Sequence, residues 1–189
     1  MSSKMIDSIK DEIIFFKEKS IFSPDVESIK PNDWESIINK FQGDYQRYYS
    51  EEFNVKKIKY FPALLATFFY RIARFCFLNG DHKNAQEFSS LAFSHTGIEI
   101  YYSAEIGNNF KMNHGVGTII GARTKIGNDV LMHHNITLGD KNGGRPTIGN
   151  GVTIYPGTVI VGDIIIGDNS VIGANVFVDK SYPENSKIF

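Results

Sequence analysis

The sequence predicts an α+β protein in which a helical N-terminal half is followed by a parallel β-helix. Residues 100–178 repeat an aliphatic side chain every six positions, a period that fits neither a helix face nor an ordinary strand face. Fifteen of the seventeen glycines lie from Gly97 onward, which suits a chain that turns tight corners at short intervals. Residues 1–95 lack this repeat and show helical patterning instead.

The hexapeptide repeat defines the β-helix. Three hexads form one triangular coil of about 18 residues, with aliphatic side chains stacked inward from coil to coil. A loosely packed all-β domain with turn glycines is the alternative, but it does not explain the register. Thirteen positions keep this register, with two slips: Ile100, Ile106, Met112, Ile120, Ile126, Met132, Leu138, Ile148, Ile154, Ile160, Ile166, Ile172 and Val178.

Two insertions interrupt the repeat and mark candidate functional loops. The first adds two residues around 113–117, and the second adds four within 139–146. A solenoid accommodates insertions only as loops that leave a coil corner, and such loops often form the binding face. The first loop contains a histidine, and the second contains Gly143-Gly144 and an arginine. We therefore expect the active site between these two loops.

Apolar spacing predicts four helices before the repeat. They cover 4–20, a stretch that starts near Pro31 with Asn32 or Asp33 as its cap, Pro62 to Leu78, and about 82–94. The third helix is apolar on nearly every side, which predicts burial within the helical half or against another subunit. We expect a helical domain over residues 1–95 and a β-helix domain over residues 96–189.

Composition narrows the class of protein. The 189 residues carry a formal net charge of −1, so no basic excess indicates a nucleic-acid partner. The single Cys76 rules out an intramolecular disulfide and fits a reducing compartment. The most apolar run, 60–70, is too short to span a bilayer, and the N-terminus has no signal-peptide pattern. We therefore expect a cytoplasmic protein without an integral membrane segment.

His114 is the strongest candidate for chemistry. A histidine in an irregular loop beside glycines can take a proton from a hydroxyl near neutral pH. It then needs a carboxylate that fixes its tautomer and stabilises the imidazolium. Glu99 lies fifteen residues earlier, just under one coil, so the two side chains can lie on neighbouring coils. A histidine that only caps its loop by hydrogen bonding is the alternative.

The other polar candidates have weaker signals. Arg145, with the Gly143-Gly144 backbone, can hold a carboxylate or phosphate in a bidentate contact, although a solvated loop charge is equally consistent. His133 and His134 are adjacent in the repeat, face opposite ways and do not readily grip one ion. We therefore expect no metal. The sequence contains no Walker or dinucleotide-binding motif.

Several stretches follow one another in a recognisable order: 97–100, 104–107, Asn113-His114-Gly115-Val116-Gly117, 130–139, Gly143-Gly144-Arg145-Pro146 and 148–178. Together they closely resemble the hexapeptide-repeat acetyltransferases, and most of all the serine O-acetyltransferase branch. The helical half, with Tyr70–Ala73 and Leu78–Gly80, also looks like the helical domain of that branch. The resemblance covers about two-thirds of the chain, and the two loops and the helical half are its most specific features.

This resemblance implies a left-handed β-helix that works as a homotrimer or a dimer of trimers. It implies acetyl-CoA as the co-substrate, bound in the groove between adjacent β-helices. It also makes His114 the general base and Glu99 the carboxylate that orients it. The remaining implied positions are Asn113 and Arg145 for substrate, and Gly139, Pro156 and Ala174 for contact with CoA.

Departures from the family pattern lie mostly on the substrate side. Glu99 replaces an aspartate and adds a methylene, and Asn113 replaces an aspartate that holds the substrate amine. Arg145 is followed directly by proline, so the histidine of the family's second loop is absent. The sequence also stops before the tail that folds over the CoA site in relatives. An acid from the helical half, such as Glu51 or Glu52, could supply the missing charge.

We therefore predict an acetyl-CoA-dependent O-acetyltransferase with serine as the leading acceptor. A sugar or polysaccharide O-acetyltransferase on the same scaffold is the main alternative, because Asn113, Tyr101 and Tyr102 suit hydroxyl groups and a sugar needs no counter-charge. A catalytically silent β-helix that serves as a binding module is a third hypothesis, against which the intact His114 loop argues. A metal enzyme similar to γ-class carbonic anhydrases needs a spacing of histidines that this sequence does not offer.

Overall fold

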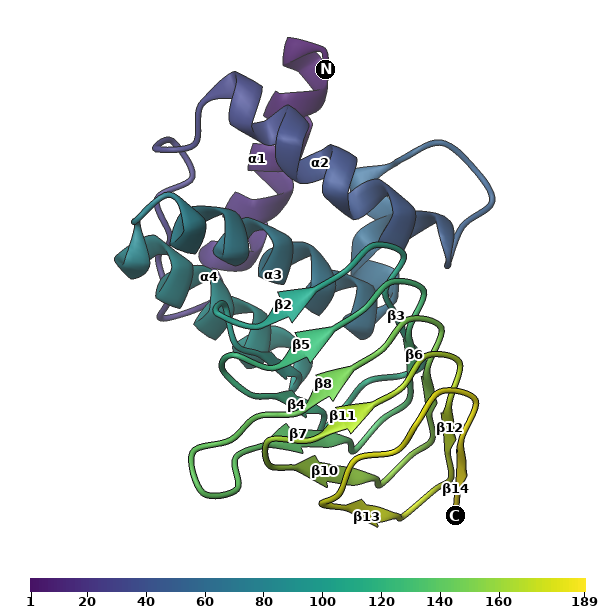
Figure 1. The fold of residues 1–189 in the computed structure, drawn as a ribbon. Helices are drawn as coiled ribbons and strands as arrows, with labels where there is room; N and C mark the ends of the chain where they lie inside the picture. The colour runs from purple at the N-terminus through teal and green to yellow at the C-terminus, as the bar shows by residue number, and fades with distance from the viewer.

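The computed structural model describes residues 1–189 as a helical part stacked on a β-helix (Figure 1). The predicted order of the two parts is confirmed. The helical part contains α1 (Ser3–Lys17), α2 (Pro31–Gln46), the 3₁₀ helix η1 (Val55–Tyr60), α3 (Pro62–Leu78) and α4 (His82–Thr96). The strands are β1 (Glu99–Ile100), β2 (Glu105–Ile106), β3 (Lys111–Met112), β4 (Ile119–Ile120), β5 (Lys125–Ile126), β6 (Leu131–Met132), β7 (Thr137–Gly139), β8 (Thr147–Ile148), β9 (Thr153–Ile154), β10 (Val159–Val161), β11 (Ile165–Ile166), β12 (Val171–Ile172), β13 (Phe177–Val178) and β14 (Lys187–Ile188).

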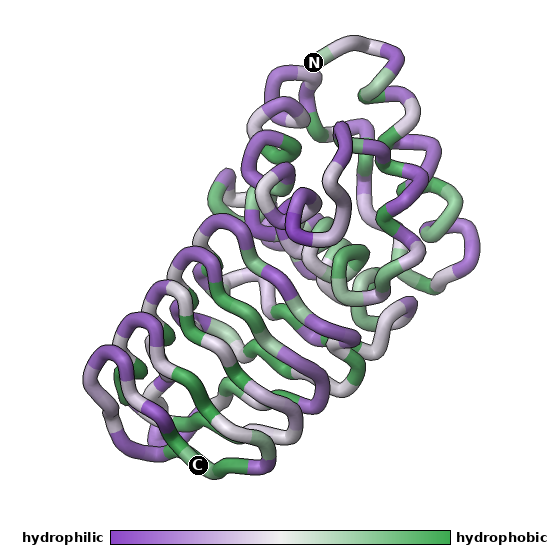
Figure 2. The backbone as a smooth tube through the Cα atoms, turned by 90° about the vertical axis from the view of Figure 1, so that its right-hand side faces the viewer, coloured by the Kyte–Doolittle hydropathy of each residue, from purple (hydrophilic) through white to green (hydrophobic).

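The strands form three parallel sheets, which are the faces of the coil. Sheet A has the order β1-β4-β7-β10-β13, sheet B the order β2-β5-β8-β11, and sheet C the order β3-β6-β9-β12-β14. The register places inward residues above one another, as in Ile120 with Leu138 and Leu138 with Ile160. All thirteen aliphatic positions of the repeat are buried, and the coils stack with their hydrophobic stretches aligned (Figure 2). The hexapeptide prediction is therefore confirmed.

Corner positions explain why asparagine and glycine alternate between the strands. Gly117, Asn135, Gly157 and Asn175 occupy one corner column, and all four have φ between 55° and 75°. The left-handed region is open to glycine and tolerated by asparagine. A Cβ added to Gly157 would lie 2.1 Å from Oδ1 of Asn175, so the close approach of successive coils requires glycine there.

Helix ends follow the expected chemistry with one exception. Asp81 accepts a hydrogen bond from the N–H of Asn84 at the start of α4, and Gly97 ends that helix with φ of 64°. The prediction that Asn32 or Asp33 caps α2 was wrong. That helix already begins at Pro31, whose fixed φ suits a first helical position, and its N-cap residue Lys30 makes no side-chain cap bond.

A buried ion pair joins α2 and α3 to the first coil of the β-helix. Arg71 donates from Nε to Oδ2 of Asp44 at 2.8 Å and from Nη2 to Oδ1 at 3.0 Å. Its remaining donors reach the carbonyl oxygens of Ile106 at 2.7 Å and Gly107 at 2.6 Å. Oδ1 of Asp44 also accepts from the N–H of Phe110 at 2.7 Å. One ion pair thus occupies three backbone groups beside β2 and β3.

Two tyrosines complete this attachment. The Tyr70 hydroxyl donates to the carbonyl of Ala104 at 2.8 Å and accepts from the N–H of Ile106 at 3.1 Å. The Tyr48 hydroxyl donates to the carbonyl of Met112 at 2.6 Å and accepts from its N–H at 3.1 Å. An edge strand otherwise presents unpaired N–H and C=O groups that invite pairing with another chain. The helical part therefore covers the open edge of the first coil.

Helix α3 belongs to both halves of the molecule. One hydrophobic cluster lies within the helical part, whereas Ala63, Ala66 and Tyr70 of α3 join the cluster that fills the β-helix. This double contact explains why α3 is apolar on nearly every side.

Helix α4 ends at Thr96 and β1 begins at Glu99, and a domain boundary at 95/96 stays a prediction. No helix is both long and apolar enough to cross a membrane.

Candidate active site

The first inserted loop connects β3 of sheet C to β4 of sheet A and holds His114 in a left-handed conformation. The φ angle is 64° at His114, 82° at Gly115 and 74° at Gly117, and the N–H of Gly115 donates to the carbonyl of Asn113 at 2.8 Å. Of nine non-glycine residues with positive φ, seven are Asn or Asp, and His114 is one of the two exceptions. This conformation costs a residue with a large side chain about 1–2 kcal/mol. Such strain concentrates at functional sites.

A pocket of 320 Å³ lies where this loop meets the helical part. Gly115 makes the close approach possible, because a Cβ there would lie 2.7 Å from Cδ1 of Ile98 and 3.1 Å from Cβ of Ala63. The pocket has aromatic walls from the helical part and polar side chains from β3 and its loop. Its lining residues are Tyr48, Tyr60, Phe61, Pro62, Ala63, Lys111, Met112, Asn113 and His114.

Two polar groups of this pocket are free to bind an acceptor. Neither the His114 ring nor the Asn113 side-chain amide makes a hydrogen bond within the chain. Lys111 donates one of its three ammonium hydrogens to the carbonyl of Arg47 at 2.8 Å. Burial raises the pKa of the Tyr48 phenol, so this wall of the pocket stays uncharged. The pocket can therefore present an imidazole and an amide to a hydroxyl compound.

Two further histidines lie beside His114. The rings of His114 and His134 meet edge to face with centroids 5.8 Å apart, and Nδ1 of His134 is buried without a hydrogen-bond partner. His133 points elsewhere and stacks on Tyr155 at 5.0 Å. Burial lowers the pKa of His133, and His134 and His114 lower it further, which keeps this imidazole neutral at physiological pH. The structure contains no group of three or more metal-ligating side chains.

Glu99 lies on β1 in sheet A, one coil before His114 in space. It pairs with Ile119, and its N–H donates to the carbonyl of Thr118 at 3.0 Å. Its carboxylate forms no hydrogen bond or ion pair with His114 in the single chain, so this pairing stays a prediction. Glu51, which could supply an acid, instead pairs with Lys57 at 2.5 Å and does not line the His114 pocket.

The second inserted loop connects β7 of sheet A to β8 of sheet B. It therefore leaves sheet A at the C-terminal ends of its strands, whereas the His114 loop enters sheet A at their N-terminal ends. Nε of Arg145 donates to the carbonyl of Ala122 at 2.9 Å, and the guanidinium pairs with Asp140. About five residues of extended chain, roughly 16 Å, separate these C-terminal ends from the corner that carries His114. One chain alone therefore does not bring Arg145 to His114.

Two of the three residues implied for CoA contact share the corner of His114. The N–H of Gly157 donates to the carbonyl of His134 at 3.2 Å, and the N–H of Asn175 donates to the carbonyl of Pro156 at 2.9 Å. These bonds stack His134, Pro156 and Ala174 on successive coils. Gly139 lies apart from them, at the end of β7 beside the second loop. The corner column thus forms a continuous rim that leads away from His114.

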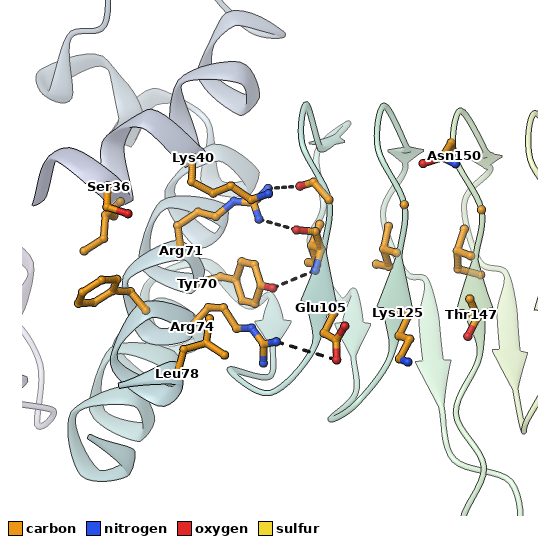
Figure 3. Close-up of a pocket in the computed structure, with 18 residues that line it drawn as sticks. Ser36, Lys40, Tyr70, Arg71, Arg74, Leu78, Glu105, Lys125, Thr147 and Asn150 are labelled. Atoms are coloured by element: carbon orange, nitrogen blue, oxygen red, sulfur yellow. Dashed lines mark hydrogen bonds and ion pairs between the residues drawn. The ribbon is translucent and has the colours of Figure 1, made fainter. Parts of the chain in front are cut away.

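A groove larger than the His114 pocket lies elsewhere. It measures 710 Å³ and runs over sheet B beneath α2 and α3 (Figure 3). Three of its four basic side chains bind oxygens of the chain itself: Arg71 pairs with Asp44, Lys40 binds the side chain of Asn108 at 2.6 Å, and Arg74 binds the carbonyl of Ser103 at 3.2 Å. None of the sequence-predicted site residues lines this groove. We therefore place the candidate site at the corner of sheets C and A.

Sequence reasoning placed only Asn113 and His114 in this pocket and missed, among others, Lys111 and the three aromatic residues. Lys111 lies two residues before Asn113, and the period of a strand puts both side chains on the outer face, so this signal was available. Tyr48 follows the end of α2, Tyr60 is the last residue of η1, and Phe61 immediately precedes α3. Nothing in the repeat indicates their position, because they lie outside it.

Comparison with known proteins agrees with this arrangement. Residues 145–180 match the family described as bacterial transferase hexapeptide (six repeats). The chain is 38% identical over 130 residues to the serine acetyltransferase of Helicobacter pylori, a match that covers 67% of this chain and 76% of that protein. It is 33% identical over 132 residues to the serine acetyltransferase of Mycobacterium tuberculosis, covering 68% of this chain and 58% of that protein.

Solved structures show the same likeness. Serine acetyltransferase isoform 3 of Entamoeba histolytica, in complex with cysteine, superposes with a TM-score of 0.76 at 30% identity, over 84% of this chain. The Neisseria gonorrhoeae enzyme in complex with serine superposes with a TM-score of 0.72 at 26% identity, over 81% of this chain. The chain spans 59% and 66% of these two longer proteins. Its identity to the Helicobacter pylori protein over three-quarters of that protein's length shows that the chain belongs to the serine acetyltransferase family.

Proposed function

We propose that this protein transfers an acetyl group from acetyl-CoA to the hydroxyl of serine. The observation that carries the proposal is the strained loop that holds a free His114 imidazole beside Asn113 in an acceptor-sized pocket. Membership of the serine acetyltransferase family supports it, as does the presence of serine or cysteine in the solved relatives.

The residues of this chain divide the proposed work between them. The thioester of acetyl-CoA supplies the acetyl group. His114 takes the proton of the acceptor hydroxyl, so that the oxygen can form the new ester bond, and later returns the proton to the departing thiolate. Asn113 offers its amide to the acceptor, and Tyr60 and Phe61 form an aromatic wall of the pocket. Glu99 orients His114 and stabilises its protonated form.

The outer rim fits a long co-substrate. Pro156 is rigid and Ala174 is small, so little side chain rises above the stacked backbone at these two positions. We propose that the pantetheine arm lies along this rim with its thioester beside His114. Gly139 would contact the same molecule from a neighbouring subunit.

We also propose that the protein assembles as a trimer, or as a pair of trimers. The outward face of sheet A leaves Ile119 41% and Phe177 63% exposed, and closed three-fold symmetry would cover such faces. The same symmetry would carry the Arg145 loop of one subunit toward the His114 corner of the next. Light scattering at micromolar concentration tests this directly, and a stable monomer would contradict it. The free, buried Cys76 suits a cytoplasmic location, which cell fractionation checks.

A sugar O-acetyltransferase is the second candidate. The pocket of His114 contains no acidic side chain, so it offers no counter-charge to the ammonium of serine. Thiol release from acetyl-CoA in the presence of serine, other amino acids and a panel of sugars separates the two candidates. Acetylation of a sugar with no turnover of serine would favour the second.

His114→Asn is the sharpest test of the mechanism. Asparagine accepts a positive φ, so this variant removes the imidazole without adding backbone strain. We expect kcat to fall by about 10²–10⁴-fold, the usual contribution of a general base, with little change in the KM for acetyl-CoA. His82→Asn makes the same substitution at an exposed histidine of α4 and serves as the control. Near-normal turnover by His114→Asn would move the role of base to His134.

A further inference from the structure

We infer that Lys111 binds the carboxylate of the acceptor and makes the enzyme selective for hydroxyl compounds that carry one. This inference rests on the proposed function, because it concerns the acceptor pocket of His114. It assigns a residue that neither the repeat nor the family resemblance singles out.

Lys111 is placed to reach an acceptor. It lies on β3, and the side chains of Lys111 and Asn113 leave the same face of the chain about 7 Å apart at Cα. Both line the pocket that contains His114. A small amino acid can therefore span the three residues, with its hydroxyl at His114, its carboxylate at Lys111 and its remaining polar group at Asn113.

The charge around Lys111 is uncompensated. Its Nζ donates to the neutral carbonyl of Arg47 at 2.8 Å and lies 5.0 Å from the centroid of the Tyr48 ring. The Arg47 guanidinium adds a second positive charge and is likewise bound only to carbonyls, those of Asn109 at 2.7 Å and Val130 at 3.0 Å. No acid lines the pocket. Two of the three ammonium hydrogens of Lys111 are free. An acceptor carboxylate would accept hydrogen bonds from them and balance the positive charge.

Other lysines of the chain show what a compensated ammonium looks like. The hydrogen bond from Lys57 to Glu51 raises the pKa of Lys57. Burial lowers the pKa of Lys111 instead, and the nearby Arg47 lowers it further. The charged form of Lys111 is therefore less favourable than that of Lys57, and an anion in the pocket would offset this difference.

Arg145 does not fill this role within the chain. Its guanidinium is already paired with Asp140 and with the carbonyl of Ala122. It lies at the C-terminal ends of the sheet A strands, whereas His114 lies at their N-terminal ends. Lys111 is the cation that shares a pocket with His114. Asn113 gives an ammonium only a neutral oxygen, so we expect affinity to depend on the carboxylate of the acceptor far more than on its amine.

Binding experiments test the inference without turnover. Ligand-observed NMR titrations of the full chain compare L-serine, 3-hydroxypropionate, which lacks the amine, and ethanolamine, which lacks the carboxylate. We expect Lys111→Gln to weaken L-serine and 3-hydroxypropionate by about 10- to 100-fold, the range of a charge-assisted hydrogen bond. Ethanolamine binding stays unchanged, and Lys111→Arg retains part of the affinity for the two acids.

Lys187→Gln is the matched control. Lys187 occupies the equivalent outward position on β14, the last strand of sheet C, so the same change is made on the same face away from the pocket. Unchanged affinities in Lys111→Gln, weakening by Arg145→Gln alone, or a parent protein that binds neither acid would each overturn the inference. Normal, Lys111-dependent binding without thiol release from acetyl-CoA would leave the inference intact and reject the proposed function.

Discussion

The first and last coils of the β-helix differ in how the rest of the chain covers them. At the first coil, Arg71, Tyr70 and Tyr48 bind backbone groups of β2, β3 and their connections. At the last coil, no helix of residues 1–189 covers β11, β13 or β14 (Figure 1). A parallel stack ends in unpaired backbone groups at both ends, so it needs either a polar cover or water there. Here the cover is built from side chains, and its stability is concentrated in a few of them.

The largest expected effect comes from Arg71→Met, which removes part of the cover at the first coil. It leaves Asp44 fully buried without its counter-ion, and it removes the donors of two carbonyls in the first coil. We expect the free energy of unfolding to fall by about 3–5 kcal/mol, the usual loss when one partner of a buried ion pair is removed. Urea unfolding followed by the fluorescence of the single, buried Trp34 measures it.

The matched control for Arg71→Met is the ion pair nearer the other end. Lys141 and Asp179 form a 2.7 Å pair whose side chains are 46% and 40% exposed. Because solvent screens such a pair, Lys141→Met is expected to change the free energy of unfolding by less than about 1 kcal/mol. Equal losses in the two variants would show that the cover of the first coil is no more important than a surface contact.

Tyr70→Phe has a smaller expected effect and sharpens the comparison. The change removes one hydroxyl and leaves the carbonyl of Ala104 and the N–H of Ile106 buried without partners. Each unsatisfied group costs about 1–3 kcal/mol, so we expect a loss of that order in the same urea experiment. Tyr182→Phe, near the last coil, removes a hydroxyl that makes no hydrogen bond and is expected to change stability by less than about 0.5 kcal/mol. A loss in Tyr182→Phe as large as that in Tyr70→Phe would contradict the difference between the ends.

The fold was largely predictable because the hexapeptide repeat can be recognised from single aliphatic residues at a fixed spacing. Each aliphatic position of the hexad is buried, and the first residue of α3 and its last, Pro62 and Leu78, match the prediction. The 3₁₀ helix η1 was not predicted, since its six residues carry no helical period. The attachment of the two halves was also beyond sequence reasoning, because Asp44 and Arg71 are 27 residues apart and meet only after both helices have packed.

The candidate site was predictable in part. The insertion beside His114 marked the loop, but its strained φ and its pocket depend on Gly115 meeting α3. The expectation that the active site lies between the two loops stays a prediction, and within one chain the loops are apart. The second insertion follows the first by more than one coil, so it leaves a different corner, and Arg145 lies one strand of sheet A away from His114. Counting insertions by corner as well as by coil would have shown this separation.

The pairing of neighbouring coils also implies that the coils fold in the order in which they are synthesised. Paired positions in the three sheets are never more than 22 residues apart, the separation of Thr137 from Val159. The entropy of closing such short loops is small and nearly the same for each coil. A chain that leaves the ribosome from its N-terminus presents the helical part first, and each further coil emerges onto an edge that is already in place. Synthesis thus adds the coils in the sequence in which each one depends on its predecessor.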